Sequence, residues 1–340
     1  MNAWKHTLDA YKVTWDEEAQ SLAPITPSDS ATRIIPLVQR AAFSVTGPDA
    51  EKFLQGQLTC DLREVNEHGS RLGAHCTPKG SMIALYRLVK LKDGYLLHCP
   101  ANLFEAGFAA LKKYSIFSKV EMTDLRDSKV GLGLIGPGAE SLMHKLFESI
   151  PTEVDRIVTQ DGLIGARLPG RRFELWMGTD QSADVLKSLI DMAPLGSTND
   201  WELSEIMAGV PDIEAASSEQ YIPQMTNLQA LKGVSFKKGC YTGQEIVARL
   251  QHRGKLNKPM YVVDIETDAL PAIGTPIHSD NRQHAGHILR VAKTETGAKA
   301  LAVITKTEAD EHPLSLDGGG AITVAELPYE LDPELFVAKR

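Results

Sequence analysis

The stretch from residue 235 to residue 253 constrains the fold most, because it joins a glycine-containing turn directly to a helical pattern. It reads SFKKGCYTGQEIVARLQHR. In its second half, Ile246, Val247 and Leu250 have the spacing of one apolar helix face. Thr242 is placed to cap this helix, and the first turn carries an acid where the helix dipole favours negative charge. The stretch therefore predicts a tight loop followed by a helix, with a cysteine just before the helix.

Cys240 is the candidate reactive residue of this loop. Lys237 and Lys238 precede it and a helix N-terminus follows it, so both sides place positive potential near the sulfur. Positive potential stabilises a thiolate relative to a thiol. Gly239 and Gly243 on either side indicate a close approach of the backbone rather than core packing. The alternative is a small buried hydrophobe, as free cysteines often are.

The same loop carries a family resemblance. Lys238-Gly239-Cys240-Tyr241-x-Gly243-Gln244-Glu245 resembles the signature of the YgfZ-type folate-binding proteins. These are relatives of the glycine-cleavage T-protein, an aminomethyltransferase, and the resemblance links them to the maintenance of iron–sulfur enzymes and hence to tRNA modification. Similar runs lie upstream, at Ile222-Pro223-Gln224, Asn227-Leu228-Gln229-Ala230 and Phe53-Leu54-Gln55-Gly56-Gln57-Leu58-Thr59.

The resemblance implies a fold, a cofactor and a site. The implied fold is α+β, with two ferredoxin-like α+β parts around a central folate channel and a small C-terminal β-barrel. The implied cofactor is tetrahydrofolate or another reduced folate, and Cys240 is the implied functional thiol. A tryptophan in the context Trp-Glu-Leu-x-x-Ile-x-Ala-Gly faces the folate in the family, and Trp201 has this context. The candidate folate-binding residues are Trp201, Lys238, Gly239, Tyr241, Gln244, Glu245, Arg249, Gln57 and Asn227.

One departure from the T-protein pattern concerns the residue that holds the pterin. A T-protein has a glutamate directly before Ala-Gly, and this chain has Met207 there. Glu205 is two positions away on a different helix face, so it does not replace that glutamate. An aminopyrimidine edge needs a carboxylate or amide partner. The candidates for this role are Gln57, Gln224 and Asn227.

Two further departures concern acids. Cys240 stands where the matching turn of a T-protein carries an acidic residue. Residues 80–85 contain no acid, whereas a T-protein places there the aspartate needed to move a proton at the folate nitrogen. These departures favour a non-catalytic, folate-binding accessory protein that supports iron–sulfur enzymes. A tetrahydrofolate-dependent aminomethyl or one-carbon transferase is the alternative.

A second alternative is a thiol-dependent hydrolase, with His252 as the base that activates Cys240. His252 lies about three turns along the predicted helix, roughly 15–18 Å from the cysteine at about 1.5 Å per residue. This separation argues against the dyad unless the helix breaks. For Trp201, the alternative is a core tryptophan near a helix start.

Length and cysteine usage indicate the class of protein. A chain of 340 residues is long enough for two or three domains. No apolar run approaches the length of a membrane span, and the first residues lack the pattern of a signal peptide. The cysteines show neither CxxC spacing nor a disulfide framework; they are Cys60, Cys76, Cys99 and Cys240. We therefore expect a protein of the reducing cytoplasm.

Charge bears on the partners. The net charge of −8 argues against direct binding of nucleic acid through phosphates. A local cluster of cations would suit a polyanion such as the glutamate tail of a folate, or is simply a solvated face; it comprises Lys237, Lys238, Arg249, His252, Arg253, Lys255 and Lys258. The partners implied by the resemblance are folate and iron–sulfur enzymes, including tRNA-modifying ones.

The pattern of strands, helices and turns divides the chain into domains. We expect an N-terminal α+β domain over 1–128, completed by a loop-helix region at 210–256, a second α+β domain over 129–209, and a β-barrel over 257–340. The predicted strands before the barrel are 33–38, 41–46, 71–76, 82–91, 95–99, one from Val130, and 154–159, 163–168 and 172–177. The predicted helices cover 48–57, a segment through Phe104 and Leu111, 138–149, 181–192 and 200–208.

At the N-terminus, Trp4, Leu8, Tyr11 and Trp15 have helical spacing. They predict an amphipathic helix to about Leu22, packed on the body of the protein. Pro24 and Pro27 would end it.

Two further motifs resemble ligand sites, but their positions in the predicted strands argue against binding. Gly131 to Gly136 matches GxGxxG, but the glycines lie inside the predicted strand instead of after it, so no dinucleotide site is expected. His284 and His287 would face opposite sides of an extended segment, so no metal site is expected.

Overall fold

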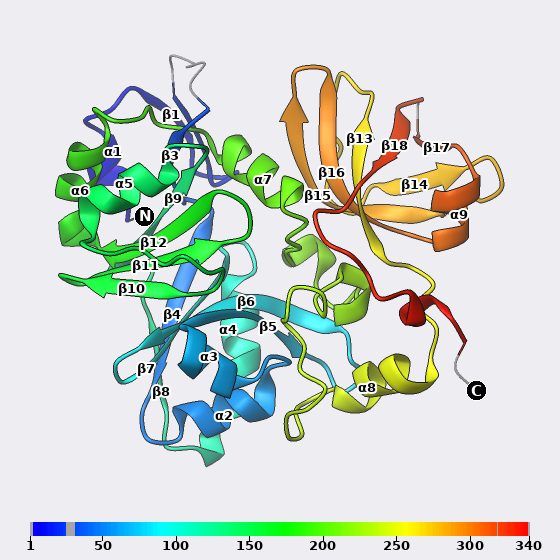
Figure 1. The fold of residues 1–340 in the computed structure, drawn as a ribbon, viewed down its shortest axis with the longest axis horizontal. Helices are drawn as coiled ribbons and strands as arrows, with labels where there is room; N and C mark the ends of the chain where they lie inside the picture. The colour runs from blue at the N-terminus through cyan, green and yellow to red at the C-terminus, as the bar shows by residue number, and fades with distance from the viewer. Residues whose placement is uncertain (1–2, 25–30, 318, 339–340) are drawn as a thin grey trace. The chain divides into compact units, whose positions relative to one another are not determined.

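The computed structural model describes residues 3–24, 31–317 and 319–338. They form two compact units, each assembled from segments that are distant in sequence. Unit 1 comprises the residues up to Phe53, Leu62–Arg71 and Arg87–Trp201, and unit 2 comprises Leu54–Asp61, Leu72–Tyr86 and the residues from Glu202 onward. The chain therefore passes repeatedly between the two units, and Figure 1 traces its path.

Unit 1 contains an antiparallel five-stranded sheet with the order β10-β11-β12-β9-β3. Its strands are β3 (Arg33–Pro36), β9 (Lys129–Ile135), β10 (Ile157–Gln160), β11 (Leu163–Leu168) and β12 (Arg172–Gly178). Helices α5 (Ala139–Leu146) and α6 (Ser182–Leu189) lie against this sheet (Figure 1). Leucines of β9, α5 and α6 share one buried core. This strand and helix pattern confirms the prediction for this part of the chain.

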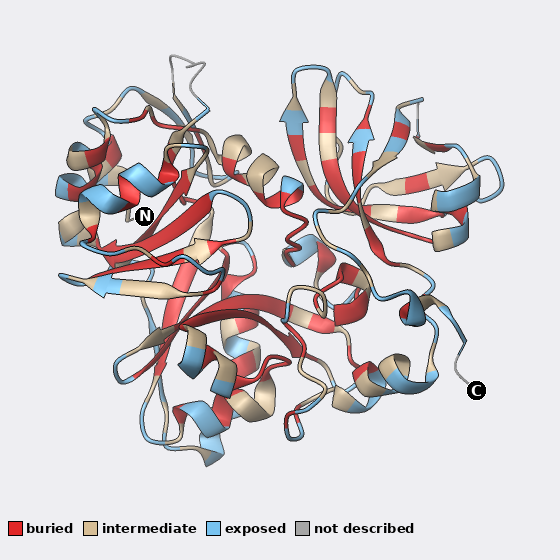
Figure 2. Ribbon diagram, viewed as in Figure 1, coloured by how far each residue is buried: buried red, intermediate tan, exposed pale blue. Residues whose placement is uncertain are grey.

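A second five-stranded sheet has the order β5-β6-β7-β4-β8. Its strands are β4 (Arg40–Thr46), β5 (Ser70–Cys76), β6 (Met82–Leu91), β7 (Gly94–Pro100) and β8 (Glu121–Asp124), and β5 and β6 have residues in both units. The predicted turn at Asp93-Gly94 does join β6 to β7. The accompanying helices are α2 (Ala50–Gln57), α3 (Leu62–His68) and α4 (Phe104–Lys112), of which α3 was not predicted. Figure 2 shows that β4, β5, β6 and β7 are buried over most of their length, whereas β8 is mostly exposed.

The predicted C-terminal β-barrel is confirmed. Six strands close it in the order β13-β16-β15-β14-β17-β18. They are β13 (Met260–Ile265), β14 (Pro276–Ser279), β15 (Gly286–Thr294), β16 (Gly297–Ile304), β17 (Leu314–Leu316) and β18 (Ala321–Ala325), with α9 (Lys306–Glu311) between β16 and β17. Small and branched apolar side chains fill the interior, among them Val263, Ala300 and Ile304.

The predicted N-terminal helix is largely wrong. Helix α1 covers only Lys5–Leu8, and a hairpin of β1 (Val13–Asp16) and β2 (Ser21–Pro24) follows it. The β-branched and aromatic residues of β1 favour a strand, and this preference prevails over the helical spacing. The four spaced residues nevertheless contact the core of unit 1 as expected. Pro27 lies outside the described residues.

Two details of unit 1 follow from backbone conformation. The strand predicted from residue 154 begins only at Ile157, because Asp155 has a φ of 68° and cannot continue an extended segment. The GxGxxG glycines do lie largely inside β9. A Cβ at Gly133 would come within 2.4 Å of the Trp201 indole, so this glycine serves packing and not phosphate binding.

Among the described helices, none combines the length and the apolar character needed to cross a bilayer.

Candidate functional site

Cys240 lies on a loop of unit 2 that precedes α8 (Gln244–Arg253). Its side chain is exposed, whereas Cys60, Cys76 and Cys99 are buried. Burial raises the pKa of Cys76 to about 12, so that thiol stays protonated at neutral pH. Cys240 is therefore the cysteine that a reagent or a partner reaches from solvent, and the alternative of a small buried hydrophobe is wrong.

Lys238 holds one end of the loop instead of facing the thiol. Its buried ammonium donates to the carbonyls of Leu58 and Cys60, each at 2.6 Å, and lies 5.1 Å from the centre of the Tyr241 ring. Tyr241 is itself buried, and burial together with the nearby Cys76 raises the pKa of its hydroxyl. Of the two lysines before the cysteine, only Lys237 is exposed. Lys238 and Tyr241 thus anchor the loop.

Gly243 holds the other end. The helix cap is Gly243, with a φ of 84°, and the predicted cap at Thr242 is wrong. A Cβ at Gly243 would lie 2.5 Å from the carbonyl oxygen of Thr77, so only glycine fits there. The expected close approach at Gly239 is wrong, since a Cβ there would meet no atom within 4 Å. Close packing therefore requires the second glycine and not the first.

Hydrogen bonds tie the loop to the end of α2. The amide of Thr242 donates to the carbonyl of Gly56 at 3.2 Å, and its hydroxyl lies 3.4 Å from Oε1 of Gln57. Gln57 is half-buried. It is therefore a predicted site residue that the fold does bring to the Cys240 loop.

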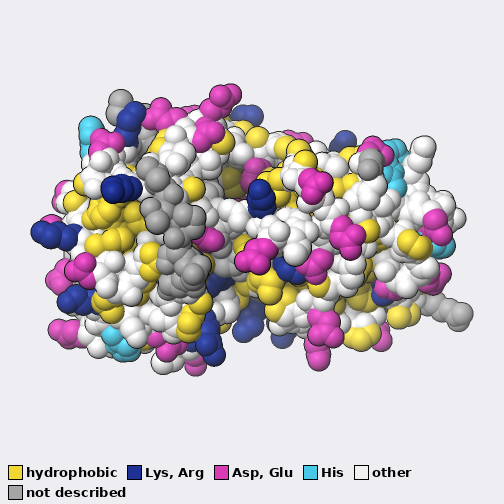
Figure 3. All heavy atoms as spheres, turned by 90° about the horizontal axis from the view of Figure 1, so that it is seen from above, with side chains coloured by type: hydrophobic (Ala, Val, Ile, Leu, Met, Phe, Trp, Pro, Cys, Tyr) yellow, Lys and Arg dark blue, Asp and Glu magenta, His cyan; other side chains and the backbone are white. Residues whose placement is uncertain are grey.

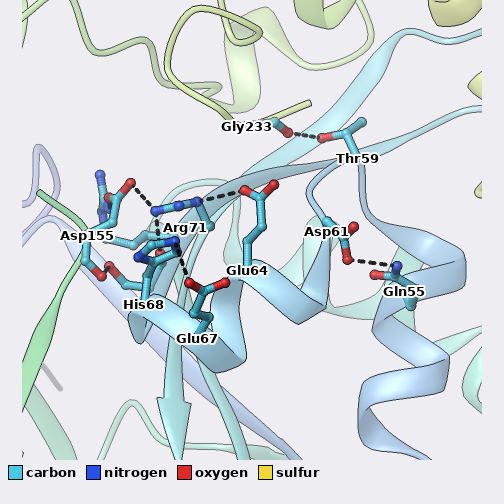
Figure 4. Close-up of polar contacts among 11 residues, drawn as sticks. Gln55, Thr59, Asp61, Glu64, Glu67, His68, Arg71, Asp155 and Gly233 are labelled. Atoms are coloured by element: carbon cyan, nitrogen blue, oxygen red, sulfur yellow. Dashed lines mark hydrogen bonds and ion pairs between the residues drawn. The ribbon is translucent and has the colours of Figure 1, made fainter. Parts of the chain in front are cut away.

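Thr59 is a positioning residue that sequence reasoning missed. Its hydroxyl donates to the carbonyl of Gly233 at 2.6 Å, as Figure 4 shows, and accepts from the amide of Ala74 at 2.9 Å. Its own carbonyl accepts from the amide of Ser235 at 2.9 Å. Thr59 thus fixes the chain just before the Cys240 loop. The only signal in the sequence was its place at the end of the resembling run that begins at Phe53.

The buried side-chain amides of Asn227 and Gln224 differ in whether their oxygen has a hydrogen-bond partner. Asn227 donates to the carbonyl of Met260 at 2.8 Å and accepts from the Met260 amide at 3.3 Å, which ties its turn to β13. Gln224 donates to the carbonyl of Val247 at 2.6 Å. Its Oε1 is buried and has no hydrogen-bond partner among the described residues. The same is true of the hydroxyls of Tyr221 and Tyr241.

The remaining predicted residues of this segment lie on α8. Gln244 is half-buried at the first position of the helix, and Glu245 and Arg249 are exposed. The helix continues unbroken to Arg253 and so includes His252, whose ring packs edge-on against Phe236 at 6.2 Å. The helix break that a Cys240–His252 dyad would require is absent from α8.

Trp201 belongs to unit 1. It is in α7 (Thr198–Met207), and its indole is 0% exposed among Ile35, Leu37 and Leu168. The guanidinium of Arg172 lies 5.4 Å from its ring. This environment matches the alternative of a core tryptophan, and the absence of a side chain at Gly133 makes room for it.

The end of α7 shows why no acid replaces the glutamate that a T-protein carries at the position of Met207. Met207 is 54% exposed, whereas the carboxylate of Glu205 is buried and accepts from Arg290 at 3.1 Å. Arg290 also donates to Glu202 and to the carbonyl of Val210. Burial disfavours the charged guanidinium, but the two carboxylates outweigh this cost and raise the pKa of Arg290. Glu205 thus serves to hold strand β15.

Unit 1 contains a buried charge cluster that the sequence did not reveal. Asp155 accepts from Arg71 at 2.7 Å and from Arg87 at 2.9 Å, and Arg71 also reaches Glu64 (Figure 4). Nearby in the fold, His98 and Glu174 are 2.6 Å apart. Burial opposes ionisation of Glu174, yet His98 and Arg87 prevail and lower its pKa to about 2. Glu174 is therefore ionised at neutral pH, and Asp155 serves as a structural partner of Arg71 and Arg87.

Comparisons with known proteins add family membership to this geometry. Residues 31–159 match the family described as the GCVT N-terminal domain. The chain is 35% identical over 319 residues to the tRNA-modifying protein YgfZ of Pectobacterium carotovorum subsp. carotovorum, covering 92% of this chain and 96% of the relative. It is 34% identical to the protein of the same name from Enterobacter sp. strain 638, covering 91% and 97%.

A solved structure supports the same assignment at the level of the fold. The glycine cleavage system aminomethyltransferase T from Bartonella henselae is 16% identical, covers 99% of both chains and gives a TM-score of 0.75. The predicted α+β fold with a C-terminal barrel is therefore confirmed. Together with the identity to the YgfZ proteins over nearly their whole length, it shows that the chain belongs to the YgfZ family.

Proposed function

We propose that this protein is a folate-binding accessory factor that supports iron–sulfur enzymes, and through them tRNA modification, with Cys240 as its functional thiol. The observation that carries the proposal is the contrast between Cys240 and its surroundings. The thiol is exposed, while the backbone on either side is fixed by the buried Lys238 and by Gly243. A rigid loop that presents one accessible sulfur suits a residue that acts on a partner.

The link to tRNA modification comes from the relatives, which are named as tRNA-modifying proteins. The link to iron–sulfur enzymes comes from the family resemblance of the cysteine motif. A single cysteine cannot hold a cluster, because ferredoxin-type sites use four. Cys240 would therefore act together with a second protein or a small thiol. A reducing cytoplasm would keep Cys240 as a free thiol.

The residues of unit 2 fit a folate in chemical type. A pterin needs hydrogen-bond partners for its ring nitrogens and amino group. Buried polar atoms without a partner among the described residues are costly unless something satisfies them, and Gln224 Oε1 and the Tyr221 and Tyr241 hydroxyls are such atoms. Gln224 and Tyr241 come from segments that carry the family resemblance, and Tyr221 directly precedes one of them. Gln57, Gln244, Glu245 and Arg249 add exposed or half-buried amide and charged groups.

The roles of the other candidate residues follow from their contacts. Lys238 and Asn227 would shape the site through the backbone that they hold. Gly239 and Trp201 are assigned to folate by the family resemblance alone. A bound reduced folate supplies a carrier of one-carbon units. The chain's own contribution would be to bind and orient it.

Aminomethyl or one-carbon transfer is the weaker candidate. Residues 80–85, which form a turn at Gly80 and the start of β6, carry no acid to move a proton at the folate nitrogen. Glu205 is held by Arg290 and is not available for this purpose. A thiol hydrolase has no support, because α8 does not break to bring His252 to Cys240.

The first test is folate binding. Titration of tetrahydrofolate into the purified protein is expected to give a one-to-one complex by calorimetry and to quench tryptophan emission. Trp201→Phe should lose most of the quenching and keep the binding heat, whereas the control Trp176→Phe, also a buried tryptophan of unit 1, should keep both. Absence of heat and of quenching at high micromolar folate would reject the folate proposal.

The second test is catalysis. With the partner proteins of the glycine cleavage system, an aminomethylated carrier and tetrahydrofolate, the protein is expected to release no ammonia and form no methylene-folate above background. The reason is the missing acid in residues 80–85. A T-protein assayed in parallel serves as the positive control. Turnover within about tenfold of that control would make the transferase the leading assignment.

A further inference from the structure

The outer side of α8 and its flanking segments carries a concentration of positive charge. Lys237, Arg249, His252, Arg253 and Lys255 are all exposed, and Val247 is the buried residue of the helix. Figure 2 shows this helix coloured mainly as exposed or intermediate. Glu245 is the acid within residues 235–258. We call these five residues the α8 basic face.

The four lysines and arginines of this face have no carboxylate partner among the described residues. Within residues 3–24, 31–317 and 319–338, none of their four side chains makes an ion pair or a hydrogen bond. Some cations elsewhere do have such partners, for example Arg126 with Asp124 and Glu105, and Lys306 with Asp310. On the face that Figure 3 shows, acidic and basic side chains are interspersed. Residues 237–255 therefore bring four exposed, unpaired cations together in a protein with a net charge of −8.

Spacing along the helix makes the face continuous. Arg249 and Arg253 are four residues apart in α8, so their side chains lie on the same side, about 5–6 Å from each other at Cβ. Lys255 follows directly after the helix ends at Gly254. Lys237 belongs to the anchored loop that also presents Cys240. The charge and the accessible thiol thus share one rigid segment of unit 2.

We propose that the α8 basic face binds RNA through its phosphate backbone. Clustered, unpaired cations on one face are the electrostatic footprint of phosphate contacts, and arginine suits them because its planar fork donates two hydrogen bonds to one phosphate. The negative net charge of the whole chain argued against nucleic-acid binding. Salt screens charges beyond about 8–10 Å, so a phosphate at this face interacts mainly with the nearby cations. The inference goes beyond the proposed function and needs no bound folate.

The test uses the full-length protein and a fluorescently labelled, unmodified tRNA, with anisotropy measured at 50 to 200 mM KCl. The wild type is expected to bind with a micromolar Kd at the lowest salt. The triple variant Arg249→Gln, Arg253→Gln and Lys255→Gln should bind at least tenfold more weakly. The slope of its log affinity against log salt concentration should be less steep by about 2, because each phosphate contact contributes about 0.7 to 0.9 to that slope.

A matched control removes the same charge at dispersed, exposed positions of unit 1, with Lys52→Gln, Lys145→Gln and Lys187→Gln. It is expected to bind tRNA within about twofold of the wild type. An equal loss in this control, an unchanged affinity of the triple variant, or a wild-type Kd above about 100 μM at 50 mM KCl would overturn the proposal.

A second arm separates phosphates from the carboxylates of a polyglutamate tail. Pentaglutamate is expected to compete poorly with tRNA. If the triple variant loses binding of pteroyl-pentaglutamate while its tRNA affinity is unchanged, the face is a carboxylate site and the RNA proposal is wrong. Because the tRNA arm contains no folate, its failure would leave the folate proposal standing.

Discussion

Replacing Cys240 with serine is expected to abolish support of iron–sulfur-dependent tRNA modification in cells that lack the native protein. The fold and the folate affinity should stay nearly unchanged. The side chain is exposed, so no core contact is lost, and the anchors of the loop at Lys238 and Gly243 are untouched. Surface substitutions of this kind usually change the free energy of unfolding by no more than about 0.5 kcal/mol.

The measurement pairs complementation with chemical labelling. Modified nucleosides from tRNA are quantified by mass spectrometry in cells carrying the wild type or Cys240→Ser, with thermal unfolding of both proteins as the control for folding. In the purified wild type, iodoacetamide at neutral pH should label Cys240 first, and the buried Cys60, Cys76 and Cys99 serve as internal controls. Slow labelling of Cys240 together with full complementation by the serine variant would make the residue a structural bystander.

Local signals in the sequence predicted much of the fold. The apolar spacing after Gly243 predicted α8, and the short strands separated by glycines after Pro259 predicted the barrel. Such signals work where one periodicity has no competitor. At the N-terminus two signals compete, because Trp15 satisfies both a helical spacing and a strand preference, and the structure has a hairpin there.

The direction of individual side chains was less accessible to sequence reasoning. Lys238 adjoins Gly239 and Cys240 in sequence, yet its ammonium turns to carbonyls about 180 residues away. A similar long-range partner decides the role of Glu205, which Arg290 holds from strand β15. Sequence spacing describes neighbours along an element, whereas these contacts depend on how distant elements pack. The candidate residue was therefore predictable at Cys240, but the residues that hold its loop in place, such as Thr59, were not.

Exchange of Asp155 for asparagine is expected to destabilise unit 1 by about 3–5 kcal/mol, the usual cost of breaking a buried ion pair by removing one partner. Arg71 and Arg87 have side chains only 3% and 5% exposed, and both donate to this carboxylate. Without its charge, two buried guanidinium groups lose their shared counter-ion. Asparagine keeps the shape of the side chain and tolerates the φ of 68°, so the effect reports charge and not backbone strain.

Urea unfolding followed by tryptophan emission measures this effect, because Trp4, Trp15, Trp176 and Trp201 all belong to unit 1. The matched control is Asp161→Asn, the same chemical change at an exposed aspartate that also has a positive φ, 51°. Its free energy of unfolding should stay within about 0.5 kcal/mol of the wild type. Glu64→Gln should cost less than Asp155→Asn, because Glu64 is 43% exposed and contacts only Arg71 of the two arginines. If Asp155→Asn destabilised the protein no more than Asp161→Asn does, the two arginines would not depend on this carboxylate.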